Sequence, residues 1–277
     1  MDARDPDRGA PPKPFRIDPA DVAALAVARA RVLERIEHAA RRAGRDGSGV
    51  RLVAVSKGVS PERLRAAVAA GLDVLGENRV QEALGKIGQV QGASWHLVGP
   101  LQSNKARRAV EVFAMIESVD STELAIRLDR LAGELRPARP FPVLLQVNVD
   151  ADPAKAGFRP PELAAALPDI LALPNLEIRG LMTVGRLVAA AEAARPTFVA
   201  LRRLFEALRR DHPSLGPELS MGMSDDFPVA VEEGATIVRV GRALFGERPH
   251  VYEGGHGPAH GEETRVHRPG DRAVPGT

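Results

Sequence analysis

Eight short apolar stretches recur along the chain, and most are followed by a longer stretch in which apolar residues repeat every three or four positions. The short stretches have six to nine residues and are rich in valine, leucine and isoleucine, which is typical of buried strands. The longer stretches are rich in alanine, leucine and arginine and have the period of amphipathic helices. Strands are therefore predicted at 51–56, 73–78, 94–99, 114–119, 142–149, 176–184, 218–223 and 236–241.

The predicted helices follow the strands at about 61–71, 79–91, 103–111, 121–135, 161–173, 188–211 and 226–234, with a short turn at 242–246. A further helix precedes the first strand: Asp18 can cap its start, and the pattern stops at Gly44. Strands that alternate with helices pair in parallel through right-handed crossovers. Eight such units predict a closed (β/α)₈ barrel of the α/β class.

An open doubly wound sheet is the main alternative to the barrel. The sequence has neither a GxGxxG nor a GxxxxGK[ST] phosphate loop to favour it. The barrel is predicted to occupy residues 18–248 and to fold alone, because residues 1–17 and 249–277 are rich in proline, glycine and charge and are expected to be disordered tails. Four of the seven histidines lie in the second tail, in no zinc-ligand spacing, and we expect them to be solvated.

Composition excludes several classes of protein. The chain has no cysteine, which rules out disulfides and thiolate chemistry, and its net charge of +2 points to no nucleic-acid partner. No apolar run approaches the roughly 20 residues of a membrane span, and the first residues are not a secretory signal. A cytoplasmic protein without membrane contact is expected.

Lysine is scarce in this chain, since only five of its 38 basic residues are lysines. Arginine keeps its proton in proteins, whereas a desolvated lysine can lose it and act as a nucleophile. The few lysines are therefore candidates for places where arginine would not serve. For Lys13 and Lys86 we accept the simpler explanation that lysine stands there by chance.

Three lysines fall at the predicted carboxyl ends of strands, where the chemistry of a (β/α)₈ barrel lies. Lys57 ends the first strand, and Lys105 and Lys155 follow the third and fifth. "SMGMS" (220–224) and "VGRALFG" (240–246) each combine a glycine with groups that bind phosphate, after the seventh and eighth strands. An amine that can react with a carbonyl, beside a phosphate cradle, suggests a ligand that carries both groups. The alternatives are that each glycine motif is an ordinary turn and that Lys57 is a surface lysine.

Several motifs in order resemble one known family. "VAVSKGVSPE", "LGENRVQEA", "WHLVGPLQSNK", "VNVDADPAKAGF", "RGLMTV" and "LSMGMSDDFPVAVEEGATIVRVGRALFG" resemble those of the pyridoxal 5′-phosphate homeostasis proteins over about residues 20–248. The resemblance implies one barrel like the N-terminal domain of alanine racemase, with pyridoxal 5′-phosphate held as a Schiff base on Lys57. The other implied cofactor contacts are Ser220 or Ser224 and the backbone of Gly241 and Arg242 at the phosphate, Asn78 and Met182 at the ring, and Arg239 at the pyridine nitrogen.

Arg242 departs from the family, which often has a small hydroxyl residue there; its backbone N–H remains, and its guanidinium could itself pair with phosphate. Arg239, a permanent donor, would keep the pyridine nitrogen unprotonated and the ring a weaker electron sink. A salt bridge within the barrel, for instance to Glu77, is a compatible role for Arg239.

Other polar residues near the predicted site have structural explanations. We expect His96 to be a hydrogen-bonded core residue, and Asp225 and Asp226 to cap and charge the start of the following helix. Lys105 could reach the site or stand at a helix start.

Two functions remain open, with a third less favoured. A carrier would bind pyridoxal phosphate, buffer its free level and pass it to apo-enzymes, acting as a monomer. A racemase needs a proton-transfer group on each face of the α-carbon, and the one tyrosine, Tyr252, lies in the predicted tail. Carrier function without substantial catalysis is therefore predicted, with an alanine-racemase-type enzyme as the alternative; an aldolase acting on a sugar phosphate fits the motifs less well.

Overall fold

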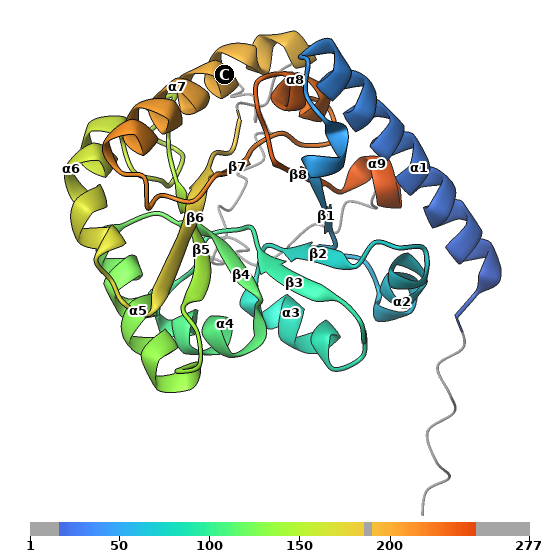
Figure 1. Ribbon diagram of the computed structural model, residues 1–277. Helices are drawn as coiled ribbons and strands as arrows, with labels where there is room; N and C mark the ends of the chain where they lie inside the picture. Colours follow the sequence, from blue (N-terminus) through green and yellow to red (C-terminus); the bar gives the residue numbers. More distant parts are fainter. Residues whose placement is uncertain (1–16, 186–189, 248–277) are drawn as a thin grey trace, which may run out of the picture.

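The eight predicted strands all form, and they close into a parallel barrel (Figure 1). This computed structural model describes residues 17–185 and 190–247. Each strand pairs with the next one along the chain, and β8 pairs with β1, so the open doubly wound sheet is excluded. The strands are β1 (Arg51–Val55), β2 (Val74–Glu77), β3 (Ser94–Leu97), β4 (Met115–Val119), β5 (Phe141–Gln146), β6 (Leu176–Met182), β7 (Glu218–Ser220) and β8 (Ile237–Val240).

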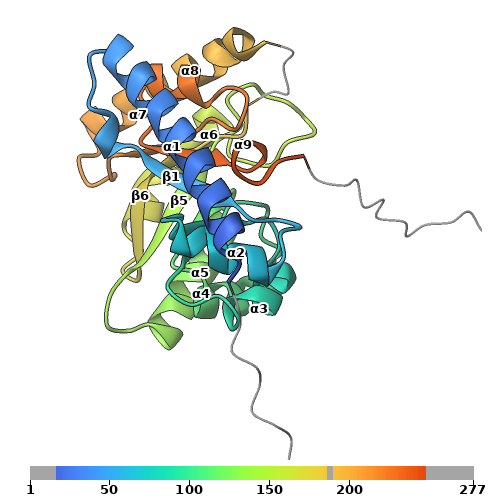
Figure 2. The same ribbon diagram turned by 90° about the vertical axis from the view of Figure 1, so that its right-hand side faces the viewer.

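Helices surround the barrel, and the first of them, α1, crosses its outside beside α2, α8 and α9 (Figure 2). The helices are α1 (Pro19–Arg42), α2 (Pro61–Ala69), α3 (Val80–Ile87), α4 (Ala106–Val112), α5 (Thr122–Leu135), α6 (Pro160–Leu171), α7 (Arg195–Asp211), α8 (Phe227–Glu232) and α9 (Arg242–Phe245), with 3₁₀ turns η1 (Gly47–Gly49), η2 (Ser103–Lys105) and η3 (Ala191–Ala194). In the parts of the chain that the structure describes, no helix is both long and apolar enough to cross a membrane.

The predicted helix boundaries need small corrections. Asp18 caps α1 as expected, since its Oδ1 accepts the N–H of Ala20 at 2.9 Å. The helix expected over 188–211 is an α-helix only from Arg195, and residues 188 and 189 lie outside the described residues. The helix expected over 103–111 begins as the 3₁₀ turn η2. The two predicted tails, 1–17 and 249–277, fall almost entirely outside the described residues, so their expected disorder stays a prediction.

The apolar residues form two separate cores. The larger core lies between the strands and the helices, as the helical periodicity predicts. The smaller one fills the inside of the barrel and consists of Val53, Val98, Met115, Leu144, Met182 and Ile237. A polar group lies at the start of the strands, where Glu218 Oε1 accepts from Arg51 at 3.1 Å and from Arg179 at 2.8 Å. The sites of (β/α)₈ barrels lie at the opposite, carboxyl end of the strands.

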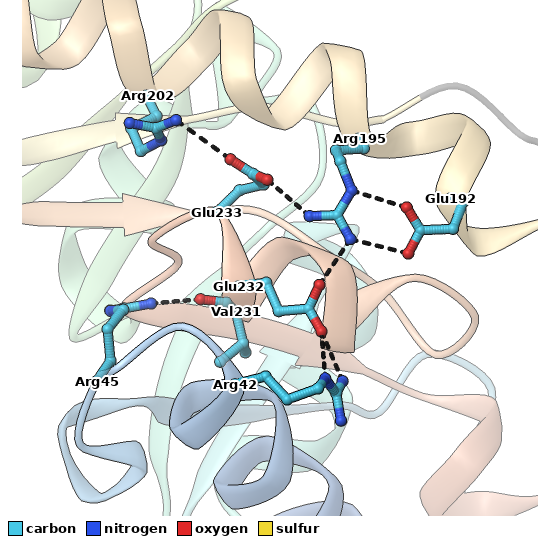
Figure 3. A network of polar contacts seen from close by, with 8 residues as sticks. All are labelled: Arg42, Arg45, Glu192, Arg195, Arg202, Val231, Glu232 and Glu233. Atoms are coloured by element: carbon cyan, nitrogen blue, oxygen red, sulfur yellow. Dashed lines mark hydrogen bonds and ion pairs between the residues drawn. The ribbon is translucent and has the colours of Figure 1, made fainter.

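A network of arginines and glutamates joins the first helix to the last helices (Figure 3). Arg195, at the start of α7, contacts Glu192 and lies 2.6 Å from both Glu232 and Glu233. Glu232 also pairs with Arg42 of α1 at 2.6 Å. The hydrogen bonds that Arg195 donates to Glu192, Glu232 and Glu233 raise the pKa of its guanidinium above the ordinary value. Single exposed pairs stabilise little, but a shared network fixes α1, α7 and α8 against one another.

Candidate functional site

Lys57 lies at the carboxyl end of β1 and points away from the core. Ser56, which precedes it, is fully buried, whereas Lys57 is exposed. Among the described residues, the Lys57 side chain makes no hydrogen bond or ion pair, unlike Lys86 and Lys155. β1 pairs with β2 on one side and with β8 on the other, so the ends of those strands flank Lys57. A free amine therefore stands between Asn78 and Gly241.

Asn78 and Met182, the residues expected beside a cofactor ring, lie at the ends of β2 and β6. Asn78 is half-buried, and Gly99 packs so closely on it that a Cβ at residue 99 would lie 2.5 Å from the Asn78 carbonyl oxygen. Met182 is fully buried and belongs to the core inside the barrel. Both residues lie at the same end of the barrel as Lys57, and their contacts with a ring stay a prediction.

Ser224 gathers two backbone N–H groups at the start of α9. Its Oγ accepts from Gly241 at 3.2 Å and from Ala243 at 3.4 Å. The side chain is half-buried. Backbone N–H groups in the first turn of a helix and a hydroxyl are groups that bind phosphate oxygens. The residues around Ser224 therefore fit a phosphate group.

Ser220, named with Ser224 as a phosphate ligand, is used inside the barrel. It is fully buried. Its Oγ donates to Glu117 Oε2 at 2.6 Å and accepts from Arg239 Nη1 at 2.6 Å. Of the two serines, Ser224 is thus the one placed for an anion.

Glu117 organises a buried polar chain across the barrel that the sequence analysis missed. His96 Nδ1 donates to Glu117 Oε1 at 2.7 Å, which agrees with the predicted core role of His96. Burial acts to raise the pKa of Glu117, but the hydrogen bond and charge of His96, the charge of Arg239 and the hydroxyl of Ser220 hold that pKa below its usual range. The signal for Glu117 was present, because "AMIESV" carries a glutamate in a strand that is otherwise mostly apolar.

Arg239 lies at the other end of this polar chain, and its expected bridge to Glu77 is wrong. Besides Ser220, its guanidinium donates from Nη2 to the carbonyl of Thr183 at 2.7 Å. Glu77 instead accepts from Ser56 and from Lys86, both at 2.7 Å. Burial lowers the pKa of Arg239, and the charges of Glu117 and Asp226 oppose that effect. A buried cation is thus held at the carboxyl end of β8.

Arg242 pairs with carboxylates on its own side of the barrel mouth. Its guanidinium contacts Asp225 and lies 3.5 Å from Glu247. The hydrogen bond and charge of Asp225 raise the pKa of Arg242. The side chain is therefore already paired, and the backbone N–H that opens α9 is the part of Arg242 suited to an anion.

The two aspartates were expected to cap α8, and neither side chain does so. Asp226 occupies the N-cap position but makes no capping bond; its Oδ1 accepts the N–H of Met223 at 2.6 Å. Burial raises the pKa of Asp226. Asp225 pairs with Arg242. The aspartates thus shape the turn that carries Ser224.

The other described lysines differ from Lys57 in their surroundings. Lys105 ends η2, directly before α4, and Lys155 donates to the carbonyl of Val184 at 3.2 Å. Lys86, where lysine was taken to stand by chance, is buried and paired with Glu77 and Glu82. The described residues hold no cluster of metal ligands, and the tail histidines lie outside them.

Gly222 forms the turn between β7 and α8, in a conformation that other residues rarely adopt. Its φ is +91°, and an added Cβ would lie 2.5 Å from Ala230 Cβ and 2.9 Å from Phe227 Cα. The glycine thus lets helix α8 pack against the turn, whereas the sequence had suggested an approach to an anion.

Gly222→Ala is therefore expected to lower the free energy of unfolding by about 2–4 kcal/mol, through backbone strain and overpacking. Gly85→Ala is the matched control, because Gly85 lies within α3 with nothing near its Cβ position. The control should be neutral or stabilising by up to about 1 kcal/mol. Urea unfolding of both variants checks this, and equal midpoints would contradict it.

Comparison with known proteins places these features in a family. The family model for the alanine racemase N-terminal domain matches residues 27–249. The pyridoxal phosphate homeostasis protein of Pseudomonas aeruginosa is 45% identical over 226 residues, which cover 80% of this chain and 94% of the relative. The structure of PipY from Synechococcus elongatus with PLP bound is 48% identical and superposes with a TM-score of 0.66 over 72% of this chain and 93% of that one.

Alanine racemase of Corynebacterium glutamicum shares the fold alone. It is 22% identical, with a TM-score of 0.57 over 86% of this chain and 64% of the racemase chain. More than a third of the racemase chain therefore has no counterpart in the match.

Proposed function

The chain belongs to the family of pyridoxal phosphate homeostasis proteins, built on the alanine racemase N-terminal domain, and we propose that it holds pyridoxal 5′-phosphate as a Schiff base on Lys57 and buffers the free cofactor. The observation that carries the proposal is the Lys57 amine, exposed at the end of β1 without a partner among the described residues. Lys86, by contrast, is the buried lysine among the described residues, and it is held by two carboxylates.

Lys57 would bind the aldehyde of the cofactor covalently. Its neutral amine adds to the aldehyde carbon, the oxygen leaves as water, and a C=N bond replaces the C=O bond, with no oxidant or reductant needed. When bound, the cofactor supplies a ring that withdraws electrons from attached groups. The ordered end of β1 limits where the amine can lie and so favours one binding geometry.

The phosphate would lie at the start of α9, against Ser224 and the backbone N–H groups of Gly241 and Arg242. The Gly241 N–H, which donates to Ser224 Oγ at 3.2 Å here, would turn to the phosphate, and the Ser224 hydroxyl would donate to the same anion. Asn78 and Met182 would lie beside the ring. Arg239 keeps N–H groups beyond the two used for Ser220 and Thr183, and one of them would face the pyridine nitrogen.

Carrier function fits this site better than racemase function. Lys57 can exchange a proton on one face of an attached amino acid, and a racemase needs a second group on the other face. The chain's tyrosine, Tyr252, lies outside the described residues. The relatives reported above at 45% identity and over are not named as racemases. We propose that the protein acts as a monomer and hands the cofactor to apo-enzymes.

Incubation with L-amino acids in deuterated water tests this function. We expect the loaded protein to exchange the α-proton of the amino acids far more slowly than about one turnover per second, which is the rate of a slow enzyme. An alanine racemase serves as the positive control. The loaded protein should also activate an apo-enzyme that needs pyridoxal phosphate, and the unloaded protein should not. Exchange and racemisation at enzymatic rates would show a racemase instead.

A further inference from the structure

We propose that Lys86 is a positioning residue for Lys57: together with Glu77 and Glu82 it fixes the backbone on both sides of Lys57, so that the Lys57 side chain alone is free to move. The inference rests on the proposed function, because it takes Lys57 as the residue that binds the cofactor. Lys86 itself contacts neither Lys57 nor any group assigned to the cofactor above.

Lys86 joins three elements through its ammonium group. It lies on α3 with 7% of its surface exposed. Its Nζ donates to the carbonyl of Ser56 at 2.8 Å, to Glu77 Oε1 at 2.7 Å and to Glu82 Oε1 at 2.7 Å. An ammonium has three protons, and all three are used here. The end of β1, the end of β2 and the helix α3 are thereby held by one atom.

The residues on either side of Lys57 both bond to this cluster. Ser56 Oγ donates to Glu77 Oε1 at 2.7 Å, in addition to the bond that its carbonyl accepts from Lys86. The N–H of Gly58 donates to Glu82 Oε1. Gly58 has a φ of +68°, which a glycine adopts readily. The peptide groups before and after Lys57 are thus fixed, while the Lys57 side chain is exposed.

The choice of lysine at residue 86 supports a role in geometry. The chain uses arginine at 33 of its 38 basic positions, since only five are lysines. An arginine presents a planar fork, which suits two oxygens in one plane, whereas an ammonium is a compact donor to acceptors in three directions. Burying a charged pair often gives no more stability than apolar residues of similar volume would. The arrangement around Lys86 is therefore better explained by what it holds in place.

One oxygen of Glu77 also indicates that the cluster serves geometry and not stability. Glu77 is fully buried, but only its Oε1 is bonded, and Oε2 has no partner among the described residues. Burial raises the pKa of Glu77, and the hydrogen bonds from Lys86 and Ser56 oppose that effect. A buried carboxylate with only one bonded oxygen lowers the stability of the fold. Such a loss is consistent with a cluster whose role is to fix the backbone around Lys57.

The test compares Lys86→Met with Arg51→Met, which breaks an ion pair at the opposite end of the same strand. For each protein we measure the rate of Schiff-base formation with pyridoxal phosphate from its visible absorbance. Affinity for pyridoxine 5′-phosphate, which lacks the aldehyde, is measured by calorimetry, and exchange of the Gly58 amide hydrogen by mass spectrometry. The second ligand reports the phosphate and ring contacts without Lys57.

We expect Lys86→Met to form the Schiff base about 10- to 100-fold more slowly, because a displaced amine loses its orientation. Its dissociation constant for pyridoxine phosphate should stay within about twofold of that of the unmodified protein, because the phosphate and ring contacts are unchanged. The Gly58 amide should exchange faster. Arg51→Met should match the unmodified protein in all three measurements.

Two results would overturn the inference: Schiff-base formation by Lys86→Met at the unmodified rate, or equal losses in rate and in pyridoxine phosphate affinity. If Lys86→Met does not fold, Glu82→Gln takes its place, because Glu82 is partly exposed and the Lys86–Glu77 contact remains. It should slow the reaction about 3- to 10-fold, as a smaller displacement would, and no change would also overturn the inference. Absence of a Schiff base on Lys57 in the unmodified protein would refute the proposed function itself.

Discussion

Lys57→Ala is expected to abolish the absorbance band of the Schiff base, because it removes the only nitrogen that we assign to that bond. The variant should fold normally, since the side chain is exposed and makes no hydrogen bond or ion pair among the described residues. It should still bind some pyridoxal phosphate without a covalent bond, through Ser224 and the start of α9. Absorbance spectra and calorimetry measure the two effects separately.

Lys105→Ala and Lys155→Ala are the matched controls, because both lysines lie at the same end of the barrel. Lys105 ends η2, and Lys155 contacts the carbonyl of Val184. Both variants should keep the visible absorbance. If Lys57→Ala retained it and one of the controls lost it, the cofactor would be on a different strand end.

Glu117→Gln should lower the free energy of unfolding by about 3–5 kcal/mol, the usual cost of removing one partner from a buried charged network. Glu117 is fully buried and receives hydrogen bonds from His96 and Ser220. Without its charge, the buried cation of Arg239 loses one of the two carboxylate charges that stabilise it. Urea unfolding followed by the fluorescence of Trp95, the one tryptophan, measures the loss.

Ser118→Ala is the control for this variant, since Ser118 is the next residue along β4 and faces the opposite way. Its hydroxyl donates to the carbonyl of Gly99 at 2.7 Å. Loss of that uncharged bond should cost about 1 kcal/mol. A loss for Glu117→Gln no larger than that of Ser118→Ala would show that the polar chain contributes little.

The loss in Glu117→Gln should also depend on pH, in a direction that follows from linkage. Contacts with His96, Arg239 and Ser220 hold the pKa of Glu117 below its usual range, despite burial. The unfolded chain therefore takes up a proton at higher pH than the folded protein does. The stabilisation is complete above about pH 4.3, the usual glutamate value, and is lost as the pH falls through the lower folded value. The two proteins should converge in stability in that acidic range.

The barrel could be predicted because its pattern is repeated eight times. Each apolar run predicts a strand, and each amphipathic stretch predicts a helix that packs on the barrel. Small errors at the helix ends do not change the order of strands and helices along the chain. The helix boundaries at Arg195 and at η2 were missed because a single 3₁₀ turn is too short for its period of about 3.0 residues to be told from the roughly 3.6 of an α-helix. Parallel pairing then brings Lys57, Asn78 and Gly241 to one end of the barrel without any knowledge of their side chains.

The polar contacts could not be predicted in the same way, because they join residues far apart in sequence. Ser220 and Ser224 look equivalent in "SMGMS", yet one points into the barrel toward Glu117 and the other toward α9. Arg239 was matched with Glu77 on charge alone, although the register of β8 directs it toward Ser220. Lys86 was set aside because the sequence does not show that the Glu77 carboxylate and the Ser56 carbonyl lie beside it.

Borohydride reduction of the loaded protein, followed by digestion and mass spectrometry, tests most directly whether Lys57 holds the cofactor. Reduction converts the C=N bond into a stable C–N bond and so marks the nitrogen that carried it. We predict the loss of visible absorbance and a pyridoxyl label on the peptide that contains Lys57. A label on Lys105 or Lys155 with Lys57 unmodified, or no label at all, would contradict the proposed site.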